Sequence, residues 1–432
     1  MEQRWSNWSG SVRCSPKQVL RPESISQLVQ MVKEHAAEGR CMRVVGTGHS
    51  FTPLVQTDDI LISLDGLQGI EQVDRERGTV TVLAGTKLKR LGEALYAHGL
   101  AQENLGDIDV QSISGAISTG THGTGIAFGT IATQVVGLTL ITAAGELLEC
   151  SEEQNPELLK AAQVSLGMLG IIVKVTLRVV PARRLHYVSR KISLDECLES
   201  IDRLKQENSH FEFYWFPYTK WVQIKLMNET QEQVNAGSIW ATVSQLVLEN
   251  GLFWLLSEAC RLVPLLCPLV STISAFGVPD INEVNHSHRA FATPRLVRFQ
   301  EMEYNLPAEH MKTALEEIRD CINQHRFAVH FPIECRFVRG DDIWLSPAYQ
   351  RDSAYIAIHM YRGMEYKPYF RHIEEIFKRY NGRPHWGKHH TRTAEQLSEL
   401  YPRWNDFRRV REELDPQGLF LNSYLRELFY GN

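Results

Sequence analysis

Two short segments of the chain are rich in glycine, serine and threonine, and each contains one histidine. In residues 43–51 (RVVGTGHSF) an apolar run leads into a turn that presents His49, and residues 112–125 (SISGAISTGTHGTG) contain His122. Glycine lets a backbone approach a ligand closely, and successive N–H groups and hydroxyls can converge on a phosphate. Neither segment has the spacing of the two commonest nucleotide-binding loops. The pair therefore indicates a nucleotide site of another type, with two tight surface turns as the alternative.

Three charged residues in the second half of the chain could take part in a reaction. Glu334 and Arg336 are two residues apart, so on a strand both side chains point to the same face. They can form a structural ion pair or act on a substrate. Lys388 lies in the run HWGKHH, where His385 and His389 have helical i, i+4 spacing. Because no Glu-x-x-His context accompanies these histidines, we predict no metal site.

These motifs together resemble a known family. The runs VVGTGHS (44–50) and STGTHGTG (118–125) resemble the PCMH-type FAD-binding domain of the vanillyl-alcohol-oxidase-type flavoproteins. The run HWGK (385–388) narrows the resemblance to the aldonolactone oxidase branch, which includes L-gulonolactone, D-arabinonolactone and alditol oxidases. The closing run LDPQGLFLNSY (414–424) fits the same branch, so the resemblance covers nearly the whole chain.

The resemblance implies FAD as the cofactor, linked covalently to His49 through the flavin 8α-methyl group. A histidine that only forms a hydrogen bond in the turn is the alternative. Since residues 112–115 contain no cysteine, we expect a single covalent link. Other implied FAD contacts come from both glycine-rich segments, from a pair near the adenine or ribose, and from the lysine: Val45, Gly46, Thr47, Gly48, Ser50, Phe51, Ser112, Ser114, Gly115, Ser118, Gly120, Thr121, His122, Gly123, Gly170, Ile171 and Lys388.

The same resemblance assigns roles in catalysis to Glu334, Arg336 and Lys388. Arg336 would hold Glu334 in its ionised form and grip a substrate oxygen, Glu334 would accept the hydroxyl proton, and Lys388 would stabilise the negative charge of reduced flavin. Ser112 and Tyr361 complete the expected substrate site, with ordinary packing as the alternative for Tyr361. His122 as the catalytic base is a weaker alternative.

The implied function is oxidation of a sugar 1,4-lactone of the L-gulono, L-galactono or D-arabinono type. A hydride would pass to flavin N5, and O2 would then give H2O2 and an ascorbate-like product. An alditol oxidase and a lactone dehydrogenase with another electron acceptor are the alternatives. A flavin-binding protein without turnover is a third, which the intact Glu334, Arg336 and Lys388 disfavour.

Mixed strand and helix signals predict an α+β protein, and the length predicts two domains. The resemblance implies a substrate domain built on an antiparallel sheet that covers the flavin. We expect an FAD-binding domain at 1–182, a substrate domain at 183–375, and a segment at 376–432 that returns to the first domain. Periodicity predicts strands at 42–45, 60–64, 79–83, 169–180, 211–215, 221–226, 297–303, 333–339 and 355–361, and helices at 88–98, 194–206 and 308–324.

Composition restricts the possible partners and the compartment. With 432 residues, a formal net charge of −5 and 43% hydrophobic residues, the chain can build full cores and offers no basic field for nucleic acid. Eight cysteines without paired spacing and a polar N-terminus predict free thiols in the cytoplasm, not secretion. The sequence does not indicate an oligomeric state.

The segment 252–276 is unusually apolar, but it carries Glu258, Arg261, Pro264 and Pro268. These residues argue against a membrane-spanning helix. We expect a buried helical pair there, with a surface that touches a membrane or another subunit as the alternative.

Overall fold

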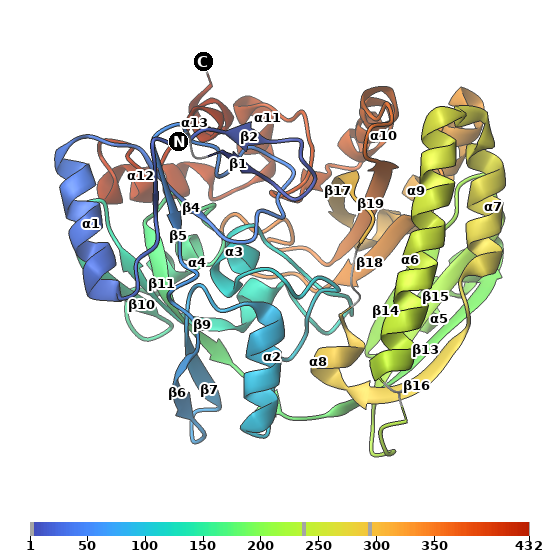
Figure 1. Cartoon of the computed structure of the whole chain (residues 1–432), viewed down its shortest axis with the longest axis horizontal. Helices are drawn as coiled ribbons and strands as arrows, with labels where there is room; N and C mark the ends of the chain where they lie inside the picture. The colour runs from blue at the N-terminus through green and yellow to red at the C-terminus, as the bar shows by residue number, and fades with distance from the viewer. Residues whose placement is uncertain (1–3, 236–238, 293–295, 432) are drawn as a thin grey trace.

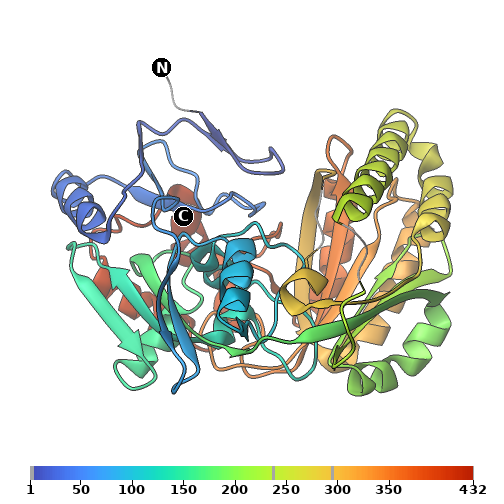
Figure 2. The ribbon, with the colours of Figure 1, turned by 60° about the horizontal axis from the view of Figure 1, so that its bottom comes forward.

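A computed structural model describes residues 4–235, 239–292 and 296–431, and for residues 239–249 it describes the backbone alone. Figures 1 and 2 show two lobes side by side. The N-terminal part of the chain, in blue and teal, and the C-terminal end, in red, form the first lobe. The middle of the chain, from green to orange, forms the second.

Two sheets organise the first lobe. Five antiparallel strands have the order β10-β9-β11-β7-β6, and three parallel strands have the order β3-β5-β4. Along β7, buried residues alternate with partly exposed ones, and the inward side chains Val80 and Val82 are fully buried. The bounds are β3 Gln18–Leu20, β4 Met42–Val45, β5 Ile60–Ser63, β6 Ile70–Asp74, β7 Thr79–Leu83, β9 Val135–Ile141, β10 Leu147–Ser151 and β11 Ile171–Arg178.

Each glycine-rich segment of this lobe is joined to a regular element. Strand β4 ends at Val45, and the turn that carries His49 follows it directly. Helix α1 (Ile25–Ala37), which precedes β4, follows the N-cap residue Ser24, whose hydroxyl accepts a hydrogen bond from the N–H of Gln27. The short helix α3 (Ile113–Ser118) occupies the start of the second segment. Helix α2 (Leu88–Ala97) precedes this segment and buries Leu88, Leu91 and Leu95 in the core of the lobe.

An eight-stranded sheet forms the second lobe, in the order β16-β13-β15-β14-β18-β19-β17-β20. Its apolar face packs on α5 (Leu194–Glu207), α9 (Met311–His325) and α10 (Lys367–Arg379) around a separate hydrophobic core. The strand bounds are β13 Arg184–Ser193, β14 His210–Trp215, β15 Trp221–Thr230, β16 Ile281–His286, β17 Phe299–Pro307, β18 Ile333–Val338, β19 Ser353–Tyr361 and β20 Arg383–Pro384. The predicted strand at 297–303 is thus β17, which runs four residues further, and α9 starts three residues later than predicted, after a 3-10 turn.

The C-terminal segment returns to the first lobe. Helices α11 (Ala394–Leu400), α12 (Trp404–Leu414) and α13 (Ser423–Tyr430) join the hydrophobic core of that lobe. The Met42 N–H donates to the Leu419 carbonyl, and the Phe51 N–H donates to the Gly387 carbonyl. Hydrogen bonds from the C-terminal segment therefore help to fix the position of β4 and of the turn that carries His49. The exact domain bounds stay a prediction.

The apolar segment 252–276 forms a helical pair, α6 (Ile239–Leu262) and α7 (Cys267–Gly277), at the outer edge of the second lobe (Figure 1). The expectation of burial is wrong. Leu262, Leu265 and Phe276 are 71%, 90% and 60% exposed, because apolar residues occur all round these helices and only one side meets the sheet. Among the described residues, no helix combines the length and the apolar character needed to cross a membrane.

Candidate active site

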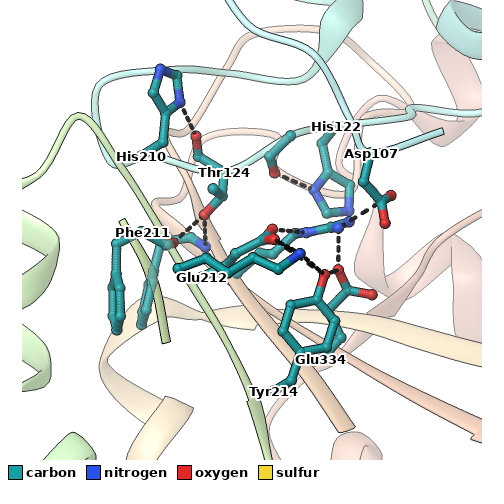
Figure 3. A network of polar contacts seen from close by, with 12 residues as sticks. Asp107, His122, Thr124, His210, Phe211, Glu212, Tyr214 and Glu334 are labelled. Atoms are coloured by element: carbon teal, nitrogen blue, oxygen red, sulfur yellow. Dashed lines mark hydrogen bonds and ion pairs between the residues drawn. The ribbon is translucent and has the colours of Figure 1, made fainter. Parts of the chain in front are cut away.

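Charged side chains gather on the face of the eight-stranded sheet that lies opposite its helices. Register places Glu212 of β14 opposite Arg336 of β18, and Tyr214 opposite Glu334. Positions two apart on a strand share a face, so Glu334 and Arg336 point the same way, as predicted from the sequence. Figure 3 shows Glu212, Tyr214 and Glu334 converging from these adjacent strands.

Arg336 is the centre of a buried ion network. Its guanidinium contacts Glu334 and Glu212, the latter at 2.8 Å, and reaches Asp107 of the first lobe at 3.2 Å. The Tyr214 hydroxyl donates to Glu334 at 2.5 Å. One guanidinium thus fixes a carboxylate from each of three separate segments, which positions Glu334 firmly.

Lys388 lies in the turn that follows β20, and it meets partners from neighbouring strands on the same face of the sheet. The ammonium of Lys388 contacts Glu301 of β17, and it stands 5.1 Å from the centre of the Phe51 ring. His359 of β19 lies opposite Glu301 in the sheet, with its Nε2 at 3.5 Å from that carboxylate. Two residues along β17, Glu303 lies 3.2 Å from Nε2 of His122. The second glycine-rich segment therefore reaches this face through His122.

The charges of the network determine the ionisation of its buried acids. Burial alone would raise the pKa of Glu212, but Lys225 and Arg336 outweigh it and lower the pKa to about 2. Burial likewise opposes ionisation of Glu301, and Lys388 with His359 lowers its pKa to about 2. Both carboxylates are consequently charged at neutral pH.

Two adjoining cavities meet at the turn that carries His49. The polar cavity lies over the charged face of the sheet, and the glycine cavity lies over the end of β4 and the start of α3. His49 and Ser50 line both cavities, so one extended ligand could occupy the two together.

His49 itself sits between an aromatic ring and a hydroxyl. Its ring stacks on Trp8 with centroids 5.7 Å apart, and its Nδ1 is 3.1 Å from the Thr47 hydroxyl. Burial, together with the nearby charge of Lys388, lowers the pKa of His49 to about 4. The imidazole is therefore neutral at pH 7 and keeps a nitrogen lone pair for a ligand.

The predicted site residues divide between the cavities. The polar cavity is lined by Glu334, Arg336, Lys388, Phe51, Thr121 and His122, besides His49 and Ser50. The glycine cavity is lined by Val45, Gly46, Thr47, Gly48, Ser112, Ser114, Gly115, Ser118, Gly170 and Ile171. Ser112, expected near the substrate, thus lies in the glycine cavity, with its Oγ in close contact with Gly46.

Three predicted residues lie outside both linings. Tyr361 packs in an apolar cluster with Phe331, and its hydroxyl donates to Glu258 at 2.5 Å. A Cβ at Gly120 would meet Pro347, and a Cβ at Gly123 would meet the Leu105 carbonyl. The two glycines therefore allow the loop to pack closely against its neighbours. His122, an implied FAD contact, approaches Glu303 and lines the polar cavity, not the glycine cavity.

Sequence reasoning missed the acidic partners of the site: Asp107, Glu212, Glu301 and Glu303. A signal was present for three of them, because Glu212 lies among aromatic residues in its strand, and Glu301 and Glu303 occupy alternate positions of theirs. A charge on a fully buried strand requires a partner. No comparable pattern marks Asp107, which lies in a loop.

The glycine cavity has donors suited to a dinucleotide phosphate. Among the described residues, no protein acceptor meets the backbone N–H groups of residues 47–50, which all line this cavity. A Cβ at Gly46 would stand 2.5 Å from the Ser112 hydroxyl, so a side chain there would close the cavity. Consecutive free N–H groups beside glycine form an anion-binding concavity. The residues present therefore fit FAD.

Comparison with known proteins agrees with this geometry. A family model described as an FAD binding domain matches residues 16–151, and one described as D-arabinono-1,4-lactone oxidase matches residues 175–428. The solved structure of cholesterol oxidase from B. sterolicum superposes with a TM-score of 0.82 at 18% identity, over 99% of this chain and 97% of the other. The protein is thus an FAD-dependent oxidoreductase that acts on CH–OH groups, with the predicted two-part flavoprotein fold.

More similar relatives define the branch. The L-gulono-1,4-lactone dehydrogenase of Mycobacterium tuberculosis is 42% identical over 98% of both chains. The L-gulonolactone oxidase of Scyliorhinus torazame is 37% identical over 100% of this chain and 99% of its own. The chain belongs to the D-arabinono-1,4-lactone oxidase family. The resemblance to the aldonolactone oxidase branch is thereby confirmed.

Buried histidines in and around the site predict acid sensitivity. Burial lowers the pKa of His210 and His390 to about 4, and that of His385 to about 3, whereas an unfolded histidine titrates near 6.5. The unfolded chain therefore binds more protons below pH 6.5, and each histidine removes on the order of 2 kcal/mol of stability by pH 4.5. We expect the thermal unfolding midpoint to fall steadily from pH 6.5 to 4.5 in a pH series of melting curves.

A variant pair tests the origin of this slope. His210→Gln should flatten the decline between pH 6.5 and 4.5, whereas His98→Gln, which changes an exposed histidine, should leave it unchanged. A midpoint that stays level across this range in the wild-type protein would contradict the prediction.

Proposed function

We propose that the protein is an FAD-dependent oxidase of a sugar 1,4-lactone, with O2 as the electron acceptor and H2O2 as a product. One observation carries the proposal: Glu334, Arg336 and Lys388 line a single cavity that adjoins the glycine cavity at His49. The named activities of the relatives, L-gulonolactone oxidase and L-gulono-1,4-lactone dehydrogenase, support a lactone as the substrate.

The residues of the polar cavity have separate roles in the reaction. Bound FAD supplies the two-electron acceptor for the C–H bond of the substrate. Glu334 accepts the proton of the substrate hydroxyl, since its carboxylate is fixed by Arg336 and by Tyr214. Lys388 places a positive charge at the other side of the cavity, where Glu301 fixes it. Phe51 and Phe299 line the cavity as well and limit the access of water.

Purified protein loaded with FAD tests this function. Adding L-gulono-, L-galactono- or D-arabinono-1,4-lactone without oxygen should bleach the visible flavin band, and admitting air should restore it with one H2O2 for each lactone. Bleaching by alditols alone would favour an alditol oxidase. Bleaching by no lactone and no alditol would reject the proposal.

A lactone dehydrogenase is the second candidate, because the 42% identical relative carries that name and because α6 and α7 expose an apolar surface. Reoxidation by a quinone or dye, with little H2O2 in air, would identify it.

We also propose that His49 carries the flavin covalently. The neutral, partly buried imidazole at the junction of the cavities supports this role. In a His49→Ala variant, flavin fluorescence in the acid-precipitated pellet should disappear, while the wild-type pellet stays yellow after washing. His122→Asn, which changes the other glycine-loop histidine, should keep the bound colour. Loss of colour in the His122 variant with retention in the His49 variant would assign the link to His122.

We further propose that the exposed end of the α6–α7 pair contacts a lipid surface. Between residues 250 and 277 the only charged side chains, Glu258 and Arg261, pair with each other at 2.6 Å, so the apolar surface carries no free charge. Leu262 and Leu265 are its most exposed large apolar residues, and Trp254, eight residues before Leu262 on α6, is half exposed. Such a surface suits the boundary between lipid headgroups and acyl chains.

Vesicle binding tests this contact. The wild-type protein should sediment with phosphatidylcholine vesicles, and the double variant Leu262→Glu, Leu265→Glu should stay in solution. Leu147→Glu, at an exposed leucine of the first lobe, should sediment like the wild type. Absence of sedimentation together with concentration-dependent dimers in light scattering would instead show that a second copy covers this surface.

A further inference from the structure

Three potential metal ligands meet in the second lobe, away from the residues that line the two cavities. Cys260 lies near the end of α6, Cys267 is the first residue of α7, and His330 lies just before β18. One sulfur or nitrogen atom from each lies within 4.8 Å of the other two. The short connection through Pro264 turns the chain back, so the two thiols face each other.

The group is closed to solvent and surrounded by apolar side chains. Cys260, Cys267 and His330 are each 0% exposed. Leu256, Leu266, Val270, Ala328 and Met364 pack around the thiols. Two thiols and an imidazole in an apolar pocket form a soft ligand set, whereas oxygen ligands would favour calcium or magnesium.

The histidine is oriented for coordination by a partner behind it. Its Nδ1 lies 3.9 Å from the sulfur of Cys267, and its Nε2 lies 2.9 Å from the buried hydroxyl of Ser257. When the Ser257 hydroxyl accepts a hydrogen bond from the Nε2–H, Nδ1 keeps its lone pair, which is directed at the thiols. Metal-binding histidines are commonly held in this way by a second hydrogen bond.

The spacing fits a bound ion. Zinc–sulfur and zinc–nitrogen bonds of about 2.3 and 2.0 Å in a tetrahedral site place ligand atoms about 3.5–4 Å apart. The measured separation of Cys267 and His330 falls in this range, and the pair is already arranged without any shift of the backbone. In the described part of the chain, no other set of three such ligands meets this closely.

We propose that Cys260, Cys267 and His330 form a binding site for a thiophilic metal ion, Zn²⁺ or Cu⁺. On binding, the metal bonds to two sulfurs and Nδ1, and the two thiol protons pass to solvent. Cys260 and Cys267 anchor the α6–α7 pair, while His330 belongs to the chain that enters the sheet. Its neighbour Phe331 packs against Phe299, which lines the polar cavity. The ion therefore ties the exposed helical pair to the edge of the candidate active site.

Metal titration of the full-length flavoprotein tests the site. Protein purified with a reductant and a chelator, then freed of both, should bind one equivalent of Zn²⁺ in competition with a chromophoric chelator. Co²⁺ should bind at the same site and give the near-ultraviolet thiolate-to-cobalt absorption band. If Cu⁺ binds stoichiometrically and Zn²⁺ does not, the site stands and its ion is copper.

Variants locate the ligands. Cys260→Ser and Cys267→Ser should abolish stoichiometric binding and the cobalt band, and Ser257→Ala should weaken binding about 10–100-fold, as loss of an orienting partner does. Cys321→Ser, at a partly exposed cysteine of α9, should bind like the wild type. If the cysteine variants do not fold, the His330→Gln variant replaces them in the test. It should lose stoichiometric binding and the cobalt band of the wild-type protein.

Three results would overturn the proposal. The first is the absence of one-to-one binding of either ion while the thiols are free. The second is binding that persists unchanged in the Cys260, Cys267 and His330 variants. The third is a Cys260–Cys267 disulfide in freshly purified protein, seen as a mass about two daltons lower that reduction restores.

Discussion

Replacing Glu334 by glutamine should lower kcat/KM for the best lactone by about 10²–10⁴-fold, because general acid–base groups contribute on that scale. Glutamine keeps the size of the side chain and its contact with Arg336, but it cannot accept the hydroxyl proton. The bound FAD and the thermal midpoint should stay close to those of the wild type. Steady-state rates and rapid-mixing bleaching of the flavin measure the loss directly.

Glu212→Gln is the matched control for this variant. Glu212 contacts the same guanidinium at 2.8 Å, but it does not line the polar cavity. Its replacement should therefore cost much less activity than that of Glu334. A Glu334→Gln enzyme that keeps more than about a tenth of the wild-type rate, or equal losses in the two variants, would contradict the role of Glu334 as proton acceptor.

Replacing Lys388 by methionine should lower the rate of flavin reduction by about 10²–10³-fold, since removal of one charge-stabilising donor costs this much in other enzymes. It should also destabilise the protein. Glu301 is buried, and without the lysine its pKa should rise from about 2 because its main counter-charge is lost. Single-turnover bleaching and thermal unfolding measure the two effects separately.

The double variant Lys388→Met, Glu301→Gln separates stability from catalysis. Removing both charges should restore much of the thermal midpoint, because no unpaired carboxylate is left in the sheet. The rate of flavin reduction should stay low. Recovery of the rate together with the stability would show that Lys388 acts only by balancing the charge of Glu301.

The parts of the site that could be predicted are those in which local sequence determines local geometry. Two-residue spacing on a strand was enough to place Glu334 and Arg336 on one face. The turn after β4 was predictable because Gly46 and Gly48 come directly before His49. For the same reason the order and type of most helices and strands followed from periodicity.

The remaining parts depend on pairings between distant segments. Asp107 reaches Arg336 only because the lobes meet, and Glu301 reaches Lys388 only because β17 lies next to the returning chain. Strand register determines such pairs, and it cannot be inferred from the sequence of one strand alone. The exposure of α6 and α7 was missed for a related reason, since apolar composition does not tell which side of a helix meets a neighbour.

The contacts of the C-terminal segment have a consequence for how the protein is made. Asn422 donates to the backbone carbonyls of Pro53 and Gln56, and the Gly387 carbonyl accepts from the N–H of Phe51. Residue 422 leaves the ribosome long after the turn that carries His49. These hydrogen bonds of the first lobe therefore cannot form until residue 422 has been translated. Because the turn of His49 lacks these contacts until then, we expect a nascent chain stalled before residue 385 to retain FAD less well than the complete chain.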